Sequence, residues 1–267
     1  MAIQFDDVSF YFFDFDDNIM FLTTPIFILN TETEKPEPFS TGEFATIHPL
    51  LGQPGKWENY AMFDGSYRNF GDIPADELQP GQKQYFVEDI EKAIESNERN
   101  WQAPSWDLFV YACKKQRPVS IITARGHSPG TLKVGLRVLV EKGLIPREPN
   151  YLTLLPVGND EVRREQLDDP GLIKTTPALK RVAIKKSVDK ALEKFGSDPE
   201  HRFGMSDDDP QNVSLILRAM CECKKDYIDK RFFVINTHMG EKVKLEVFPV
   251  DFPVTRQPES AFVEPLE

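Results

Sequence analysis

Short apolar runs alternate along the chain with segments in which apolar residues recur at helical spacing. The runs are of strand length, are rich in β-branched and aromatic residues, and cover residues 8–14, 118–123, 151–157, 201–206 and 231–237. Helical spacing extends over residues 105–115, 130–143, 176–196 and 212–225. Strands that read as continuous apolar runs between helices belong to parallel sheets that are covered on both faces. The pattern therefore predicts a three-layer, Rossmann-like α/β domain with a mainly parallel five-stranded core sheet.

Local signals at the helix ends agree with this prediction. Thr176 followed by Pro177 is a favourable start for a helix, because proline fits the first turn. Gly143 and Gly196 follow the last apolar positions of two helical segments, where glycine ends a helix.

One long segment, residues 24–83, interrupts the alternation. Six prolines and six glycines between residues 36 and 81 oppose long helices, so we expect loops and short strands, with residues 24–29 as one strand of a hairpin. A helical pattern resumes over residues 84–101. The predicted organisation is a core domain of residues 1–23 and 84–249, an inserted cap or flap of residues 24–83, and a C-terminal tail of residues 250–267.

Charge and composition exclude several classes of protein. The 32 Lys and Arg against 43 Asp and Glu give a net charge of −11, which disfavours nucleic acid and anionic membranes as partners. No stretch reaches the roughly 18 apolar residues that span a bilayer, and no basic leader precedes an apolar run. We expect a soluble, cytoplasmic protein with reduced thiols at Cys113, Cys221 and Cys223.

Polar clusters follow three of the predicted strands. Asp14, Asp16, Asp17 and Asn18 follow the first strand; Thr123, Ala124 and Arg125 end the second; Asp207, Asp208 and Asp209 follow the fourth. The carboxyl ends of parallel strands line one crevice, where ligands bind. Crowded aspartates repel one another without a cation, so we expect a cation at this edge of the sheet.

A calcium loop is the first alternative for the segment that begins at Asp14. The spacing D-x-D-x-N matches the first half of such a loop, but Ile19 stands where glycine is needed and Pro25 where a bidentate glutamate is needed. The alternative therefore fails on its later positions.

The order of these clusters resembles the haloacid dehalogenase superfamily of phosphohydrolases. Its four motifs are matched by FYFFDFD (10–16), by SIIT (120–123), by Lys180 or Lys185, and by FGMSDDD (203–209). The resemblance covers residues 8 to about 237, outside the insertion. It implies a Mg²⁺-dependent phosphatase that hydrolyses a phosphate monoester through an aspartyl-phosphate.

The resemblance also implies the role of each site residue. Asp14 would attack phosphorus, and Asp16 would protonate the leaving group and then activate water. Thr123, with Ala124 and Arg125, would bind the phosphorylated substrate, and Lys180 would offset negative charge. The Mg²⁺ ligands would be Asp14, the backbone carbonyl of Asp16, Asp207 and Asp208.

Several alternatives stay open on the sequence alone. Lys185 competes with Lys180 as the motif lysine, although Lys180 lies closer to the helix start. The register of the acidic pair is open among Asp207, Asp208 and Asn212. Asn18 stands where the family usually has Thr or Val, and His127 is a further candidate for substrate binding.

Two other functions compete with the small-molecule phosphatase. The D-x-D and T-x-R arrangement is shared with polynucleotide phosphatases of the superfamily, which remove terminal phosphates. A catalytically silent HAD-like binding protein is the second alternative, and the retained carboxylates argue against it.

Overall fold

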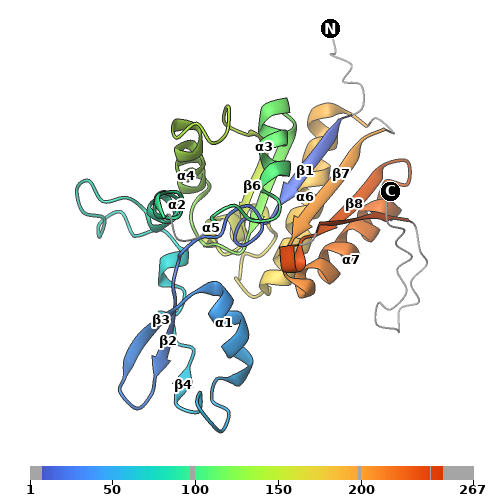
Figure 1. Ribbon diagram of the computed structural model, residues 1–267. Coiled ribbons are helices and arrows are strands. Elements are labelled where there is room, and N and C mark those ends of the chain that lie inside the picture. Colours follow the sequence, from blue (N-terminus) through green and yellow to red (C-terminus); the bar gives the residue numbers. More distant parts are fainter. Residues whose placement is uncertain (1–7, 97–99, 198–199, 241, 249–267) are drawn as a thin grey trace.

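A six-stranded sheet forms the centre of the computed structural model, which describes residues 8–96, 100–197, 200–240 and 242–248 (Figure 1). The predicted tail of residues 250–267 lies outside the described residues, as do residues 1–7 of the predicted core. The strands lie in the order β6 (Asn150–Pro156), β5 (Pro118–Thr123), β1 (Ser9–Phe13), β7 (Arg202–Asp207), β8 (Arg231–Asn236) and β9 (Val243–Val247). The first five pair in parallel and β9 pairs antiparallel with β8.

The predicted α/β class and mainly parallel sheet are confirmed, and the prediction of five strands is wrong by one. The sixth strand, β9, carries Lys244 and Glu246 between apolar positions and lies at the edge of the sheet. Edge strands are short and charged because one side of their backbone has no partner strand, so they lack the continuous apolar run of a central strand. That composition is why the sequence pattern did not reveal β9.

Two helical layers cover the sheet (Figure 1). One layer contains α2 (Tyr85–Glu95), α3 (Trp106–Lys115) and α4 (Pro129–Glu141), and the other contains α5 (Asp160–Gln166), α6 (Thr176–Phe195) and α7 (Pro210–Asp226). Because side chains alternate along a strand, Phe12 of β1 joins the core beneath α6 and α7, while Phe13 joins the core beneath α3 and α4. The aromatic run of β1 thus anchors this central strand in both cores.

Most predicted helix boundaries agree with the structure, with two differences. The N-cap of α6 is Thr175 rather than Thr176, and its side chain makes no capping hydrogen bond. The helical pattern of residues 84–101 overestimates α2, which ends at Glu95. Trp101 lies outside the helix, and its backbone carbonyl accepts a hydrogen bond from the amide of Phe21 at 2.8 Å.

The inserted segment forms a small antiparallel sheet of its own (Figure 1). Its strands lie in the order β3 (Lys35–Phe39), β2 (Ile26–Asn30) and β4 (Tyr60–Ala61), and they are accompanied by α1 (Thr41–Ile47) and the short 3₁₀ turns His48–Leu50 and Arg68–Phe70. The hairpin expected around residues 24–29 is therefore present. The end of the insertion is fastened to the core: the amide of Gly126 donates to the carbonyl of Phe70 at 2.7 Å, and the amide of Ser128 donates to Asp72 at 3.0 Å.

Within the described ranges, none of the helices has the length and apolar character needed to cross a membrane. The three cysteines are buried and free.

Candidate functional site

Three carboxylates meet at the carboxyl ends of β1 and β7. One oxygen of each of Asp14, Asp207 and Asp208 lies within 4.8 Å of the others. Asp14 is 7% exposed and Asp207 is fully buried, and the amide of Asp14 donates to the carbonyl of Ser206 at 3.0 Å, which fixes the two strand ends together. Buried carboxylate oxygens at this spacing are suited to a hard divalent cation.

Lys180, the fifth residue of α6, extends into this carboxylate cluster. Its Nζ lies 3.1 Å from Asp14 Oδ1 and 2.9 Å from Asp207 Oδ2, and its side chain is almost completely buried. Lys185 pairs instead with Asp226 at 2.7 Å, and both of those side chains are about half exposed. Of the two candidate lysines, the structure brings only Lys180 to the cluster.

The electrostatics of the cluster favour added positive charge. Burial, opposed by Lys180, raises the pKa of Asp14 well above its ordinary value, and Asp207 raises it further. Burial together with Asp207 and Asp17 raises the pKa of Asp208 to about 7. Burial acts to lower the pKa of Lys180, but Asp14 and Asp207 more than reverse this and raise it. The single positive charge of Lys180 thus does not balance the negative charge that three ionised carboxylates would carry.

The acidic run after β7 divides between the cluster and the surface. Asp207 and Asp208 belong to the cluster, whereas Asp209 is exposed. The backbone amide of Asp209 donates a hydrogen bond to Asp207 Oδ1 at 3.1 Å. Asn212 donates from its side chain to the same oxygen at 3.2 Å. Asn212 therefore supports Asp207 from the first turn of α7.

Asn18 joins the strand ends beneath the cluster. Its fully buried amide donates to the carbonyl of Asp14 at 3.0 Å and to the hydroxyl of Ser206 at 2.9 Å. Its side-chain oxygen accepts from Ser105 at 2.8 Å and from Thr237 at 2.9 Å. A primary amide supplies both N–H donors and an oxygen acceptor, which the side chains of Thr and Val do not. Asn18, at the position where the family usually has Thr or Val, therefore has a structural function.

Asp16, predicted to act as acid and base, is held by Arg125. The guanidinium donates from Nε to Asp16 Oδ2 at 2.8 Å and from Nη2 to Asp16 Oδ1 at 2.7 Å. Arg125 Nη2 also donates to Thr24 at 2.6 Å, and Thr24 in turn donates to Asp89. The carboxylate of Asp16 is consequently not part of the group formed by Asp14, Asp207 and Asp208.

The predicted substrate-binding run shows two different environments. Arg125 is fully buried, and its guanidinium lies 4.9 Å from the ring centre of Phe70 and 5.0 Å from that of Phe86. Thr123 is also buried, and its hydroxyl accepts from the amide of Arg125 at 3.3 Å. Ala124 lines the open crevice. The position of Arg125 inside the protein could not be read from the sequence, since it depends on partners from β1 and the insertion.

Replacing Arg125 by methionine is expected to destabilise the protein by about 3 kcal/mol, because the half-buried Asp16 and the buried Thr24 lose their donor and the carboxylate keeps its charge. Urea unfolding measures this loss. The matched control is Arg137→Met, which removes a surface pair with Glu148 and is expected to leave the unfolding midpoint unchanged. Equal midpoints for the two variants would contradict the role given to Arg125.

A crevice of about 860 Å³ opens beside the cluster. Its walls come from the β5–α4 and β6–α5 loops, the start of α6 and α7, and the insertion, and they include Ala124, Asn159, Thr176, Lys180, Asn212, Tyr67 and Phe70. The first two loops approach so closely that a Cβ on Gly158 would lie 2.4 Å from the carbonyl oxygen of Ala124. Glycine at this position allows both loops to frame the crevice.

His127, a further candidate for substrate binding, is fully buried, and its ring lies 5.6 Å from the ring of Phe86. Neither ring nitrogen has a hydrogen-bond partner among the described residues. Burial, with a smaller effect of Arg125, lowers its pKa to about 3, so the imidazole is neutral at pH 7.

This neutral histidine predicts an acid-sensitive fold. Between pH 6.5 and about 3 the unfolded chain binds a proton that the folded chain rejects, so stability rises with pH through this window and falls as the pH is lowered. The full effect is on the order of 5 kcal/mol. His127→Phe is expected to flatten the dependence of unfolding free energy on pH between 7 and 4, measured in urea. An unchanged slope would contradict the assignment.

No family model, curated protein or solved structure matches the chain. What the fold and the site define is a class: a mainly parallel α/β protein, compatible with a Rossmann-like fold, with a carboxylate and lysine cluster at the carboxyl ends of its two central strands.

Proposed function

We propose that this protein is a Mg²⁺-dependent phosphatase of the haloacid dehalogenase superfamily, which hydrolyses a phosphate monoester through an aspartyl-phosphate on Asp14. The observation that supports it most is the convergence of Asp14, Asp207 and Asp208 with the buried Lys180. These residues come from three separate segments, and their order and types are those of the superfamily's motifs.

The donor set is compatible with Mg²⁺. Asp14, Asp207 and Asp208 offer oxygen atoms only. Burial and the neighbouring carboxylates raise the pKa of Asp14 and of Asp208, and an added cation would offset this crowding of negative charge. When bound, Mg²⁺ would neutralise the phosphoryl oxygens, without which one anion would attack another.

The residues of the chain then divide the reaction between them. An oxygen of Asp14 attacks phosphorus as the bond to the leaving oxygen breaks, and Asp16 gives that oxygen its proton. A water molecule next attacks phosphorus, Asp16 takes the proton from it, and Asp14 is released as a carboxylate. Lys180 and Thr123 balance charge and donate to the phosphoryl group.

Arg125 fits this scheme as a positioning residue for Asp16. Its two hydrogen bonds use one lone pair on each carboxylate oxygen, and the remaining lone pairs can exchange a proton with the leaving group or water. The bidentate contact fixes the plane of the carboxylate, which keeps a general acid in one orientation.

A small phosphorylated molecule is the substrate class that the crevice favours. Its volume of about 860 Å³ is within the range of small-molecule sites, and Tyr67 and Phe70 from the insertion give it an aromatic wall. Three acidic residues, Asp72, Asp160 and Asp209, also line it. Together with the net charge of −11, they disfavour a polynucleotide substrate.

Release of inorganic phosphate from a panel of phosphate monoesters tests the proposal. The panel should contain an aryl phosphate, sugar phosphates, nucleotides, phosphopeptides and a 3′-phosphorylated oligonucleotide. We expect turnover of small monoesters that requires added Mg²⁺ and stops with a chelator. Preference for the oligonucleotide would shift the assignment to a polynucleotide phosphatase, and absence of turnover across the panel with Mg²⁺ would favour a silent binding protein.

A further inference from the structure

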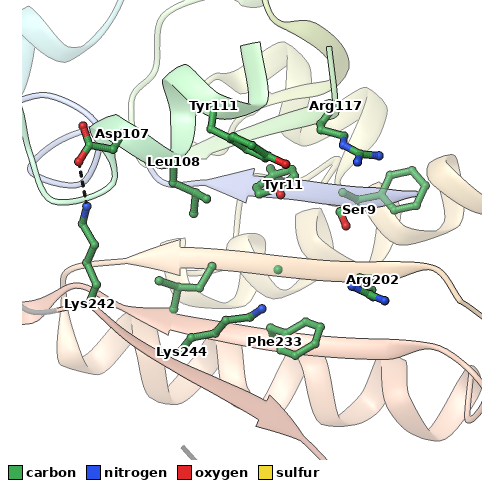
Figure 2. A pocket seen from close by; sticks show the side chains of 13 residues that line it. Ser9, Tyr11, Asp107, Leu108, Tyr111, Arg117, Arg202, Phe233, Lys242 and Lys244 are labelled. Atoms are coloured by element: carbon green, nitrogen blue, oxygen red, sulfur yellow. Dashed lines mark hydrogen bonds and ion pairs between the residues drawn. The ribbon is translucent and has the colours of Figure 1, made fainter. Parts of the chain in front are cut away.

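A second concave surface lies on the sheet face that carries α3, away from the carboxylate cluster. It is a groove of about 660 Å³ between α3 and the half of the sheet formed by β7, β8 and β9 (Figure 2). Gly204 of β7 lines it without a side chain. Tyr11, Tyr111 and Phe233 line it with aromatic rings (Figure 2). Tyr111 is exposed, Tyr11 is half-buried and Phe233 is buried, so the groove offers apolar surface that a partner segment can cover.

The groove is electropositive, although the chain as a whole is acidic. It is lined by Arg117, Arg202, Lys242 and Lys244. Among the residues that the structure describes, Asp107 is the one acidic residue in the lining, and it is paired with Lys242 at 3.4 Å (Figure 2). Lys244 Nζ lies 4.0 Å above the ring of Phe233. Partial burial, with Arg231 and Arg202 nearby, lowers the pKa of Lys244, as expected for a cation among cations.

The neighbouring acidic residue on β9 is already engaged. Glu246 accepts two hydrogen bonds of 2.8 Å from Arg231, on the strand next to it. An anionic segment that enters the groove would therefore meet the positive charge of Lys244, whose pKa is lowered more by Arg231 and Arg202 than it is raised by Glu246.

The chain itself provides a complementary segment directly after β9. Strand β9 ends at Val247, which pairs with Phe232 one residue from the Arg202–Arg231 pair. The following residues, 249–267, lie outside the described structure; their sequence contains four prolines, Phe252, Phe262 and a net charge of −3. Nineteen residues of extended chain reach on the order of 60 Å, which exceeds the length of the groove's strands.

We propose that residues 249–267 turn back from the edge strand and dock in this groove as an extended, proline-rich segment. Proline removes backbone donors, so the segment is unsuited to extend the sheet but well suited to an aromatic groove, as in polyproline recognition. Its acidic residues meet the lysines and arginines of the groove, and its phenylalanines pack against the exposed ring of Tyr111 and the half-buried ring of Tyr11. The groove is thus an intramolecular docking site.

Limited trypsin digestion of the full-length protein tests the docking, because Arg256 lies in the middle of the segment. Docked chain is cleaved only from its open form, so the rate of cleavage after Arg256 measures the open fraction. We expect Lys244→Glu to accelerate release of the peptide 257–267, detected by mass spectrometry, by about 10-fold. The matched control is Lys190→Glu, which reverses an exposed charge on α6 whose partner is Glu193; it should cleave at the wild-type rate.

Equal cleavage rates in the wild type and Lys244→Glu would overturn the proposal. A second measurement decides the matter if Lys244→Glu lowers the stability of β9. Full-length protein with photo-reactive p-benzoylphenylalanine in place of Phe262 should cross-link to peptides that contain Tyr111 or Phe233. Cross-links to the crevice beside Asp14, or to a second copy of the chain, would also overturn it.

Discussion

Replacing Asp14 by asparagine is expected to lower phosphate release by at least about 10⁴-fold, the scale on which removal of a nucleophile acts in other hydrolases. The amide has the same shape as the carboxylate but cannot attack phosphorus. The backbone amide of Asp14 would keep its bond to the Ser206 carbonyl, and its own carbonyl would keep the bond from Asn18. Steady-state kinetics with the best substrate of the phosphate-release panel measures the effect.

The stability of this variant separates a chemical role from a structural one. Burial and the neighbouring aspartates disfavour the charge on Asp14, so without divalent ions Asp14→Asn should unfold at the same or higher urea concentration than the wild type. The matched control is Asp226→Asn, which removes an exposed carboxylate paired with Lys185 and should retain full turnover. Wild-type turnover in Asp14→Asn would refute the nucleophile assignment, and loss of turnover in both variants would indicate that the assay reports misfolding.

The sequence predicts the central sheet because its signal is local. The five parallel strands are rich in apolar residues that join the two cores, and β5 is buried at every position, while the helices between the strands carry apolar residues at helical spacing. Short elements escape this reasoning. The seven-residue helices α1 and α5 contain about two turns, too few for a period to appear, and β9 mixes charged with apolar residues.

The carboxylate cluster is predictable for a different reason: topology. Parallel strands bring their carboxyl ends together, so aspartates that follow β1 and β7 meet even though nearly two hundred residues separate them. The partners of Asn18 are not predictable in this way. Ser105 and Thr237 lie 87 and 219 residues from it in sequence and reach it from loops, where no periodicity fixes the direction of a side chain. The contact between Arg125 and Asp16 belongs to the same category.

Replacing Lys180 by methionine is expected to destabilise the protein by about 3–5 kcal/mol in the absence of divalent ions, the cost of removing one partner from a buried ion pair. Methionine fills the same volume, so the loss reflects the two carboxylates of Asp14 and Asp207 rather than a cavity. The pKa of Asp14, which Lys180 lowers, should rise further without this lysine. The loss should therefore be smaller at pH 5, where protonation relieves the repulsion, than at pH 8.

Divalent ions and a second lysine make this prediction specific. If Mg²⁺ binds the carboxylates, adding it should stabilise Lys180→Met more than it stabilises the wild type. A ligand that binds the folded state stabilises that state, and the effect grows with the affinity of the ligand. In Lys180→Met, Mg²⁺ would also replace the missing positive charge. Lys185→Met is the matched control: it lies on the same helix, breaks only the surface pair with Asp226, and should unfold with the wild type at every pH and Mg²⁺ concentration. Equal losses of stability in Lys180→Met and Lys185→Met would mean that Lys180 neutralises no buried charge. If Lys180→Met loses stability and Mg²⁺ does not restore it, the cluster is stabilised by the lysine alone and binds no cation.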